Sequence, residues 1–249
     1  MGLVYNENED LVKAYPDEQI SVEDALITVG QEAVEVGVAA VSEKEVRSFL
    51  QKVDLMAHSK QNEGIAIAVS DAFQTLLTAM RMVKKETKQA FRGIKGSGAN
   101  LDVVFVRPED VGGTIMSSGG TGSTGLYAAT GATVFAWLKT CVAGTSLSMV
   151  PSQVMKEEAA CVHIGAIDTV EVPKINRIKF TLAGTPTPSQ HVHLNIKDGS
   201  DLPFARWEMP VLVPPEGTQQ IQVDPYISGD TKLELISILI AKAEDLTLT

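Results

Sequence analysis

The hydrophobic positions of this chain change their spacing near residues 93–100, where the sequence reads GIKGSGAN. Before this segment, apolar residues recur at steps of three and four, which is the spacing of one helix face. After it, the apolar runs shorten to strand length and are separated by Gly, Pro, Asn and Asp. The pattern predicts an α+β chain, with an N-terminal helical arm at residues 1–95 and a β-rich sandwich domain at residues 96–249.

Three helices are predicted in the N-terminal part. The first follows a cap at Ser21 and extends to about Ala40, and the second begins at the Ser42 cap. The third is expected to run from about Glu63 to Phe91, where the glycines at 93, 96 and 98 end it. Their apolar stripes are expected to pack between the helices or against neighbouring subunits. In the second and third helices these positions are Val46, Phe49, Leu50, Val53, Met56, Ile67, Phe73, Leu76, Leu77, Met80 and Val83.

The β-rich part contains eight predicted strands without alternating helices, which favours an antiparallel sandwich over a parallel α/β sheet. The last strand is almost continuously apolar, so we expect it to be central or covered on both faces. The predicted strands are Leu101–Arg107, Thr133–Cys141, Ala160–Ile167, Asn176–Ala183, His191–Ile196, Arg206–Val213, Gln219–Val223 and Leu233–Lys242.

The closing segment resembles a known family. Met209–Tyr226, read as MPVLVPPEGTQQIQVDPY, and Lys232–Ile240 after it are similar to the last strands of jelly-roll viral coat proteins. The resemblance covers strand spacing, proline-rich corners and small polar loops, over the last hundred and fifty residues. It implies a jelly-roll-like fold and a shell of identical subunits. The helical part has no fixed counterpart in that family, so the long-helix-plus-sheet capsid fold of tailed viruses is an open alternative.

Composition narrows the possible partners and locations. The 249 residues carry a net charge of −10, which opposes binding of nucleic acid or anionic lipid by the whole surface. The acidic N-terminus lacks the features of a signal peptide, and no apolar run is long enough to span a bilayer. We therefore expect synthesis in a cytoplasm and no secretion by a signal peptide. The resemblance to coat proteins implies a host cell and a final location in the virion.

Basic residues gather at the end of the third predicted helix. Acids outnumber bases by twelve to four from Met1 to Asp54, but from Arg81 to Lys95 six bases face only Glu86. At helical spacing they would form one positive stripe. The stripe is expected either to pair with the acidic segment of the same or a neighbouring chain, or to contact nucleic acid or an inner membrane locally. Its members are Arg81, Lys84, Lys85, Lys88, Arg92 and Lys95.

Other candidate motifs are weaker. Gly120–Gly125 fits the glycine string of dinucleotide sites, but no strand leads into it and no acid follows at the expected distance, so a small-residue loop is the interpretation. His191 and His193 share one strand face and could bind a metal if His163 or a carboxylate approached. No third ligand stands at suggestive spacing, so a pair on the solvent-facing side of the strand is the interpretation. Cys141 and Cys161 are expected to be buried thiols, with one bridge as the alternative.

Two hypotheses follow. The first is a non-enzymatic structural protein without a cofactor, which self-assembles into a large homo-oligomeric shell, a virion capsid or coat, with other virion proteins as further partners. The second is a ligand- or carbohydrate-binding β-sandwich, with or without enzymatic activity, joined to a helical adaptor. The first predicts large closed oligomers. The second predicts a concave pocket with convergent polar groups.

Overall fold

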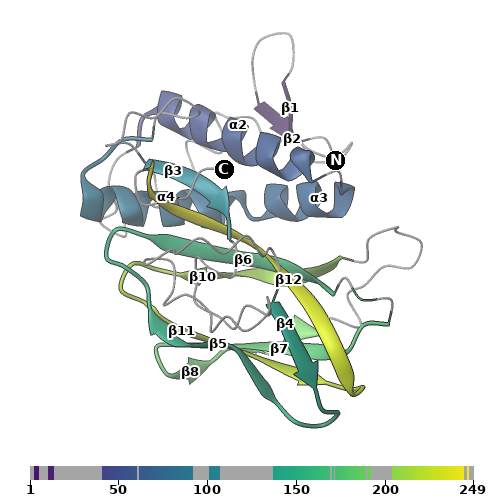
Figure 1. Cartoon of the computed structure of the whole chain (residues 1–249). Coiled ribbons are helices and arrows are strands. Elements are labelled where there is room, and N and C mark those ends of the chain that lie inside the picture. The colour runs from purple at the N-terminus through teal and green to yellow at the C-terminus, as the bar shows by residue number, and fades with distance from the viewer. Residues whose placement is uncertain are drawn as a thin grey trace. The chain divides into compact units, whose positions relative to one another are not determined.

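The computed structural model describes residues 3–5, 11–13, 41–60, 62–91, 101–106, 137–168, 170, 172–188, 190–191, 204–243 and 246. Over these residues the predicted α+β class is confirmed, with helices in the N-terminal part and two antiparallel five-stranded sheets after them (Figure 1). The chain forms two compact units, residues 1–104 with 240–249, and residues 105–239. The division falls inside β3 (Leu101–Phe105) and β12 (Gly229–Lys242).

Helix α2 (Glu43–Ser59) begins where the sequence predicts. The Ser42 hydroxyl accepts a hydrogen bond from the Glu45 N–H at 3.3 Å, and the Glu45 carboxylate accepts one from the Ser42 N–H at 3.0 Å. This reciprocal capping box satisfies two N–H groups that have no partner within the helix. The predicted apolar face is also confirmed, because Val46, Phe49 and Val53 are buried.

The predicted third helix is two helices, so its expected span is wrong. Helix α3 (Glu63–Asp71) and helix α4 (Phe73–Thr87) meet at Ala72, whose ψ of 1° lies outside the helical range. Helix α4 then ends before the glycines that were expected to stop it, because Lys88 adopts the left-handed conformation. The Thr87 hydroxyl donates to the Val83 carbonyl and accepts from the Gln89 N–H, which closes the final turn.

Two short strands precede the helices and were not predicted. β1 (Leu3–Tyr5) pairs antiparallel with β2 (Leu11–Lys13), with Val4 opposite Val12. The helix predicted after Ser21 lies outside the described residues.

The remaining strands form two sheets. In the β6 sheet the order is β10-β6-β12-β3, and β4 also pairs with β12. In the β7 sheet the order is β5-β11-β7-β8, and β9 also pairs with β7. The bounds are β4 Trp137–Cys141, β5 Leu147–Val154, β6 Ala160–Asp168, β7 Ile175–Leu182, β8 Thr185–Pro186, β9 Gln190–His191, β10 Ala205–Val213 and β11 Thr218–Pro225.

Strand β5 is absent from the prediction because Pro151 interrupts its sequence. The structure tolerates this proline because β5 lies at the edge of its sheet, where only one side needs a ladder of hydrogen bonds. The register against β11 also slips between Val150 and Gln153, so Pro151 falls at a bulge.

The predicted central position of the last strand is confirmed, since β12 has strands on both sides and is buried from Leu235 to Ala241.

The inner faces of the two sheets pack against each other within residues 105–239. The ring of Phe180 on β7 meets that of Trp207 on β10 edge-on, with centroids 6.2 Å apart, and both side chains are buried in the core. Gly165 permits a close approach of β6 and β10. A Cβ atom at this position would lie 2.4 Å from the Ala205 carbonyl oxygen and 2.5 Å from the Phe204 ring, so only glycine fits.

Candidate functional site

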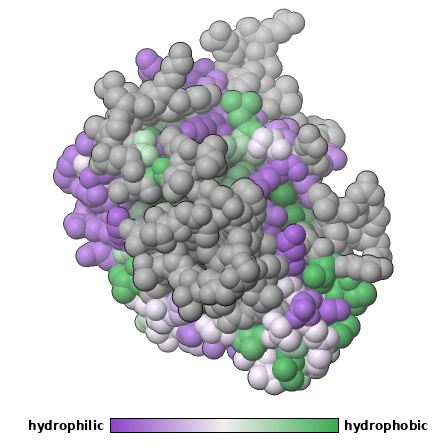
Figure 2. Space-filling model, viewed as in Figure 1, coloured by the Kyte–Doolittle hydropathy of each residue, from purple (hydrophilic) through white to green (hydrophobic). Residues whose placement is uncertain are grey.

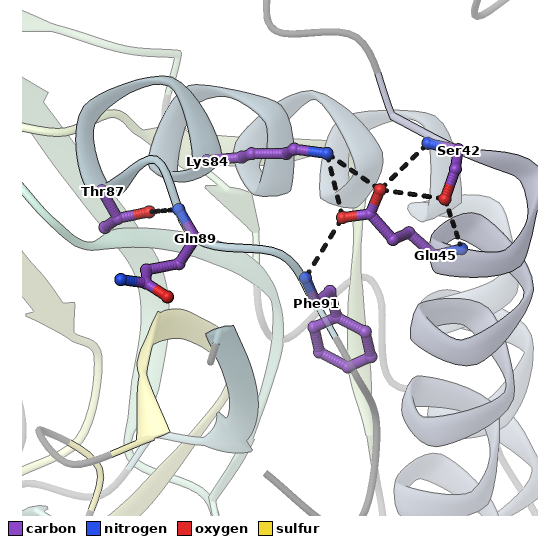
Figure 3. Close-up of polar contacts among 6 residues, drawn as sticks. All are labelled: Ser42, Glu45, Lys84, Thr87, Gln89 and Phe91. Carbon is purple, nitrogen blue, oxygen red and sulfur yellow. Dashed lines mark hydrogen bonds and ion pairs between the residues drawn. The ribbon is translucent and has the colours of Figure 1, made fainter. Parts of the chain in front are cut away.

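Glu45 joins three segments of the first unit (Figure 3). Beyond its role in the α2 cap, its carboxylate accepts hydrogen bonds from the Lys84 ammonium at 2.9 and 2.8 Å, and from the Phe91 N–H at 3.2 Å. Phe91 in turn packs its ring edge-on against Phe49, with centroids 5.3 Å apart. One side chain therefore fixes the start of α2, the last turns of α4 and the segment after α4.

The surroundings of Glu45 set its protonation. Burial by itself would raise the pKa of Glu45, but the hydrogen bonds from Lys84 and Ser42 outweigh it and hold the pKa below 4.5, its usual value. The carboxylate is therefore ionised at neutral pH, as the ion pair with Lys84 requires.

The six predicted contact residues do not form one positive stripe over the part of the chain that is described. Arg81 is buried, with 4% of its surface exposed, and Lys84 is turned toward Glu45. Lys85 is exposed, and Lys88 lies beyond the helix end, where its ammonium donates to the Lys85 carbonyl. Arg92 and Lys95 lie outside the described residues. For Lys84, the pairing is with the acidic segment of its own chain, and a polyanion contact of the group stays a prediction.

A buried polar cluster lies inside the second unit, and sequence reasoning missed it. The His163 ring on β6 contacts the Ser237 hydroxyl on β12 at 2.7 Å and the Gln219 side-chain oxygen on β11 at 2.9 Å. Since an amide oxygen only accepts, Nε2 carries the ring proton and Nδ1 accepts from the hydroxyl. Burial lowers the pKa of His163 to about 4, although the Gln219 hydrogen bond opposes this shift. The cluster is a hydrogen-bonded link between the two sheets.

The remaining predicted motifs fare differently. Cys141 and Cys161 are both buried and are not joined by a disulfide, as expected. Both ring nitrogens of His163 form hydrogen bonds, with Gln219 and Ser237. His163 therefore has no nitrogen left to bind a metal together with His191 and His193. The side chain of His191, the whole of His193 and the glycine string Gly120–Gly125 lie outside the described residues.

Three loops come together at one end of the sandwich. The Ala143 N–H in the β4–β5 loop donates to the Ser228 hydroxyl of the β11–β12 loop at 3.0 Å, and the Gly144 N–H donates to the Pro225 carbonyl at 3.0 Å. The Tyr226 N–H donates to the carbonyl of Lys174, in the β6–β7 loop, at 2.9 Å. These hydrogen bonds hold the three loops together, so that the loops form one surface at this end of the sandwich.

Each of the three loops exposes a large apolar side chain. The exposed fractions are 56% for Val142, 49% for Val172 and 37% for Ile227. We call these three residues the loop-end patch. Figure 2 shows hydrophobic surface at the lower edge of the view, where the β4–β5 and β11–β12 turns end in Figure 1. Single exposed apolar residues are ordinary, but these three stand on loops that hydrogen bonds join to one another.

Comparisons with known proteins give no family: no family model, no curated protein and no solved structure matches the chain. Among the described residues, no helix combines the length and apolarity needed to cross a bilayer. In the same part of the chain, His, Cys, Asp and Glu side chains form no group of three or more that could hold a metal ion.

Proposed function

We propose that the chain is a structural protein that assembles with copies of itself into a closed shell, and that this shell is a virion coat. The observation that carries the proposal is the pairing order of the strands. We set aside β3, which also pairs with β12, and count β8 and β9, which both pair with β7, as one edge strand. Then the first of eight strands (β4) pairs with the last (β12), β5 with β11, β6 with β10, and β7 with β9.

This order is the one obtained when a long antiparallel hairpin of eight strands is rolled into two facing sheets. The order therefore supports a jelly-roll arrangement, which occurs in viral coat proteins and also in lectins and cupins. The same fold serves several functions, so the choice among them must come from surfaces.

The loop-end patch favours self-association. Full burial of a valine or isoleucine side chain is worth about 1.5–3 kcal/mol, so covering the patch in a subunit contact would contribute several kcal/mol. The same patch recurs on every copy, and repeated contacts of this kind generate closed symmetric assemblies. A structural role also needs no cofactor.

The test is an assembly assay on the full chain, by light scattering after size exclusion and by negative-stain microscopy. We expect wild-type protein to form large closed particles. Ile227→Asp should raise the concentration needed for assembly at least tenfold, because a carboxylate would be desolvated in the contact, and tenfold corresponds to about 1.4 kcal/mol.

Val154→Asp is the matched control. Val154 is as exposed as the patch residues, at 59%, but lies at the end of β5 and not in the three loops. This variant should assemble like wild type. A wild-type chain that stays monomeric at high concentration in low and high salt would contradict the proposal, as would an Ile227→Asp variant that assembles normally.

A further inference from the structure

An open pocket lies on the outer face of the β7 sheet, within the second unit. Its volume is about 530 Å³, within the range of small-molecule sites. Polar side chains from three segments line it. They are Ser146 after the β4–β5 turn, Asn176, Arg177 and Lys179 on β7, Asp224 at the end of β11, and Tyr226 beyond it.

A bulge in β7 builds the pocket wall. Arg177 stands opposite Asp224 and Ile175 stands opposite Pro225, so Asn176 is an extra residue without an opposite number on β11. In a regular strand Asn176 and Arg177 would point to opposite faces. Here both residues line the pocket, which fits the way bulges re-aim side chains beside binding sites.

The charges of the wall are organised around Asp224. Its carboxylate accepts a hydrogen bond from the Ser146 hydroxyl and pairs with an Arg177 Nη atom at 3.3 Å. That single contact uses only part of the five N–H donors of a guanidinium. Lys179 lies on the same face two residues along β7, and its ammonium forms no hydrogen bond or ion pair with any residue that the structure describes. The wall thus carries one excess positive charge on a chain of net charge −10.

We infer that this pocket binds the carboxylate of an acidic sugar. Arg177 and Lys179 supply donors for one carboxylate, while Asn176, Ser146 and Asp224 match hydroxyl groups as donors and acceptors. The ring of Tyr226 adds an apolar wall with a polar tip. A dianion such as phosphate suits the site less well, because Asp224 would repel its second charge. The inference goes beyond the shell proposal, and its pocket shares the β4–β5 and β11–β12 loops with the loop-end patch.

The experiment is titration calorimetry of the full chain with glucuronate, with glucose and inorganic sulfate as comparison ligands. We expect saturable binding of glucuronate, with glucose and sulfate each at least tenfold weaker. Lys179→Gln should weaken glucuronate binding about tenfold, the usual effect of losing one hydrogen bond to a charged group. Asn176→Asp should weaken it similarly, because it places a second carboxylate in the wall.

Lys156→Gln is the matched control for the loss of one positive charge. Lys156 is exposed between β5 and β6 and is not part of the pocket, so this variant should bind like wild type. Equal binding of glucose and glucuronate would overturn the inference, since it would remove the role of the cations. Sulfate binding tighter than glucuronate, or unchanged binding in Lys179→Gln, would do the same.

Discussion

His163 stands in the interior of the sandwich with both ring nitrogens hydrogen-bonded, and this makes folding depend on pH. The unfolded chain takes up a proton on this side chain near pH 6.5, whereas the folded chain does so only at about 4. The contribution of His163 to the free energy of unfolding is therefore fully present above pH 6.5 and is lost as the pH drops toward 4. The slope is at most about 1.4 kcal/mol per pH unit.

The measurement is the free energy of unfolding in urea at about pH 7 and about pH 5, for which wild type should lose about 2 kcal/mol through His163. His163→Gln should have a lower free energy of unfolding than wild type at both pH values. It should not show the further loss between about pH 7 and about pH 5 that protonation of His163 causes in wild type. His58→Gln, which changes an exposed histidine of α2, should keep it. Equal slopes for wild type and His163→Gln would show that the ring does not control the pH dependence.

The sequence held a signal for this cluster. His163 interrupts the apolar run of β6, and Ser237 interrupts that of β12, so each marks a buried polar group that needs a partner. The partner Gln219 could not be identified in advance, because it comes from the facing sheet. Sequence spacing shows which residues share a strand face, but not which strands face each other.

An ion pair between Glu45 and Lys84 joins α2 to α4. Lys84→Met should lower the free energy of unfolding by about 1 kcal/mol, because Glu45 would keep its cap but lose its charged partner. Lys85→Met is the matched control on the same helix and should change stability by less than about 0.5 kcal/mol, since Lys85 is exposed.

The same contact has its own pH dependence. Since the folded pKa of Glu45 is lowered, its contribution is present above pH 4.5 and is lost as the pH falls through the lowered value. Glu45→Gln should remove this acid loss, as measured by urea unfolding below pH 4.5 against wild type. If the free energy of unfolding of Glu45→Gln fell below pH 4.5 as it does in wild type, other carboxylates would be responsible for the loss of stability in acid.

Elements were predictable where their signals are local. The Ser42 cap and the apolar steps after it predict the start and the buried face of α2. The break at Ala72 was not predictable, because the apolar steps continue across it from α3 into α4. Strand β5 was missed for the opposite reason: Pro151 is unfavourable in a general strand and harmless on this edge, and the edge position is a property of the whole sheet.

At the scale of the molecule, the sequence offers a resemblance to a fold but no local pattern that predicts which strands pair. β4 and β12 are joined by the register Cys141–Gly229, between residues far apart in the chain. Neither strand carries a local signal for the other, since the pairing follows from the burial of both sheets at once. The loop-end patch is likewise invisible until the three loops are brought together.

The response of assembly to salt follows from where the charges and the apolar groups lie. Lys84 is paired within its own unit and Arg81 is buried, so these two cations are withdrawn from contacts with other molecules. The loop-end patch, in contrast, is apolar, and salt does not screen apolar burial. We therefore expect particles to persist between about 0.05 M and about 0.5 M sodium chloride, and sulfate salts to strengthen assembly. Light scattering across this series checks the prediction, with Ile227→Asp as the weakened reference.

Particles that dissolve as salt rises would instead identify charged contacts as the main force that holds the assembly together. Lys85→Met and Lys88→Met would then be the variants that distinguish whether these lysines bind a neighbouring subunit or a polyanion.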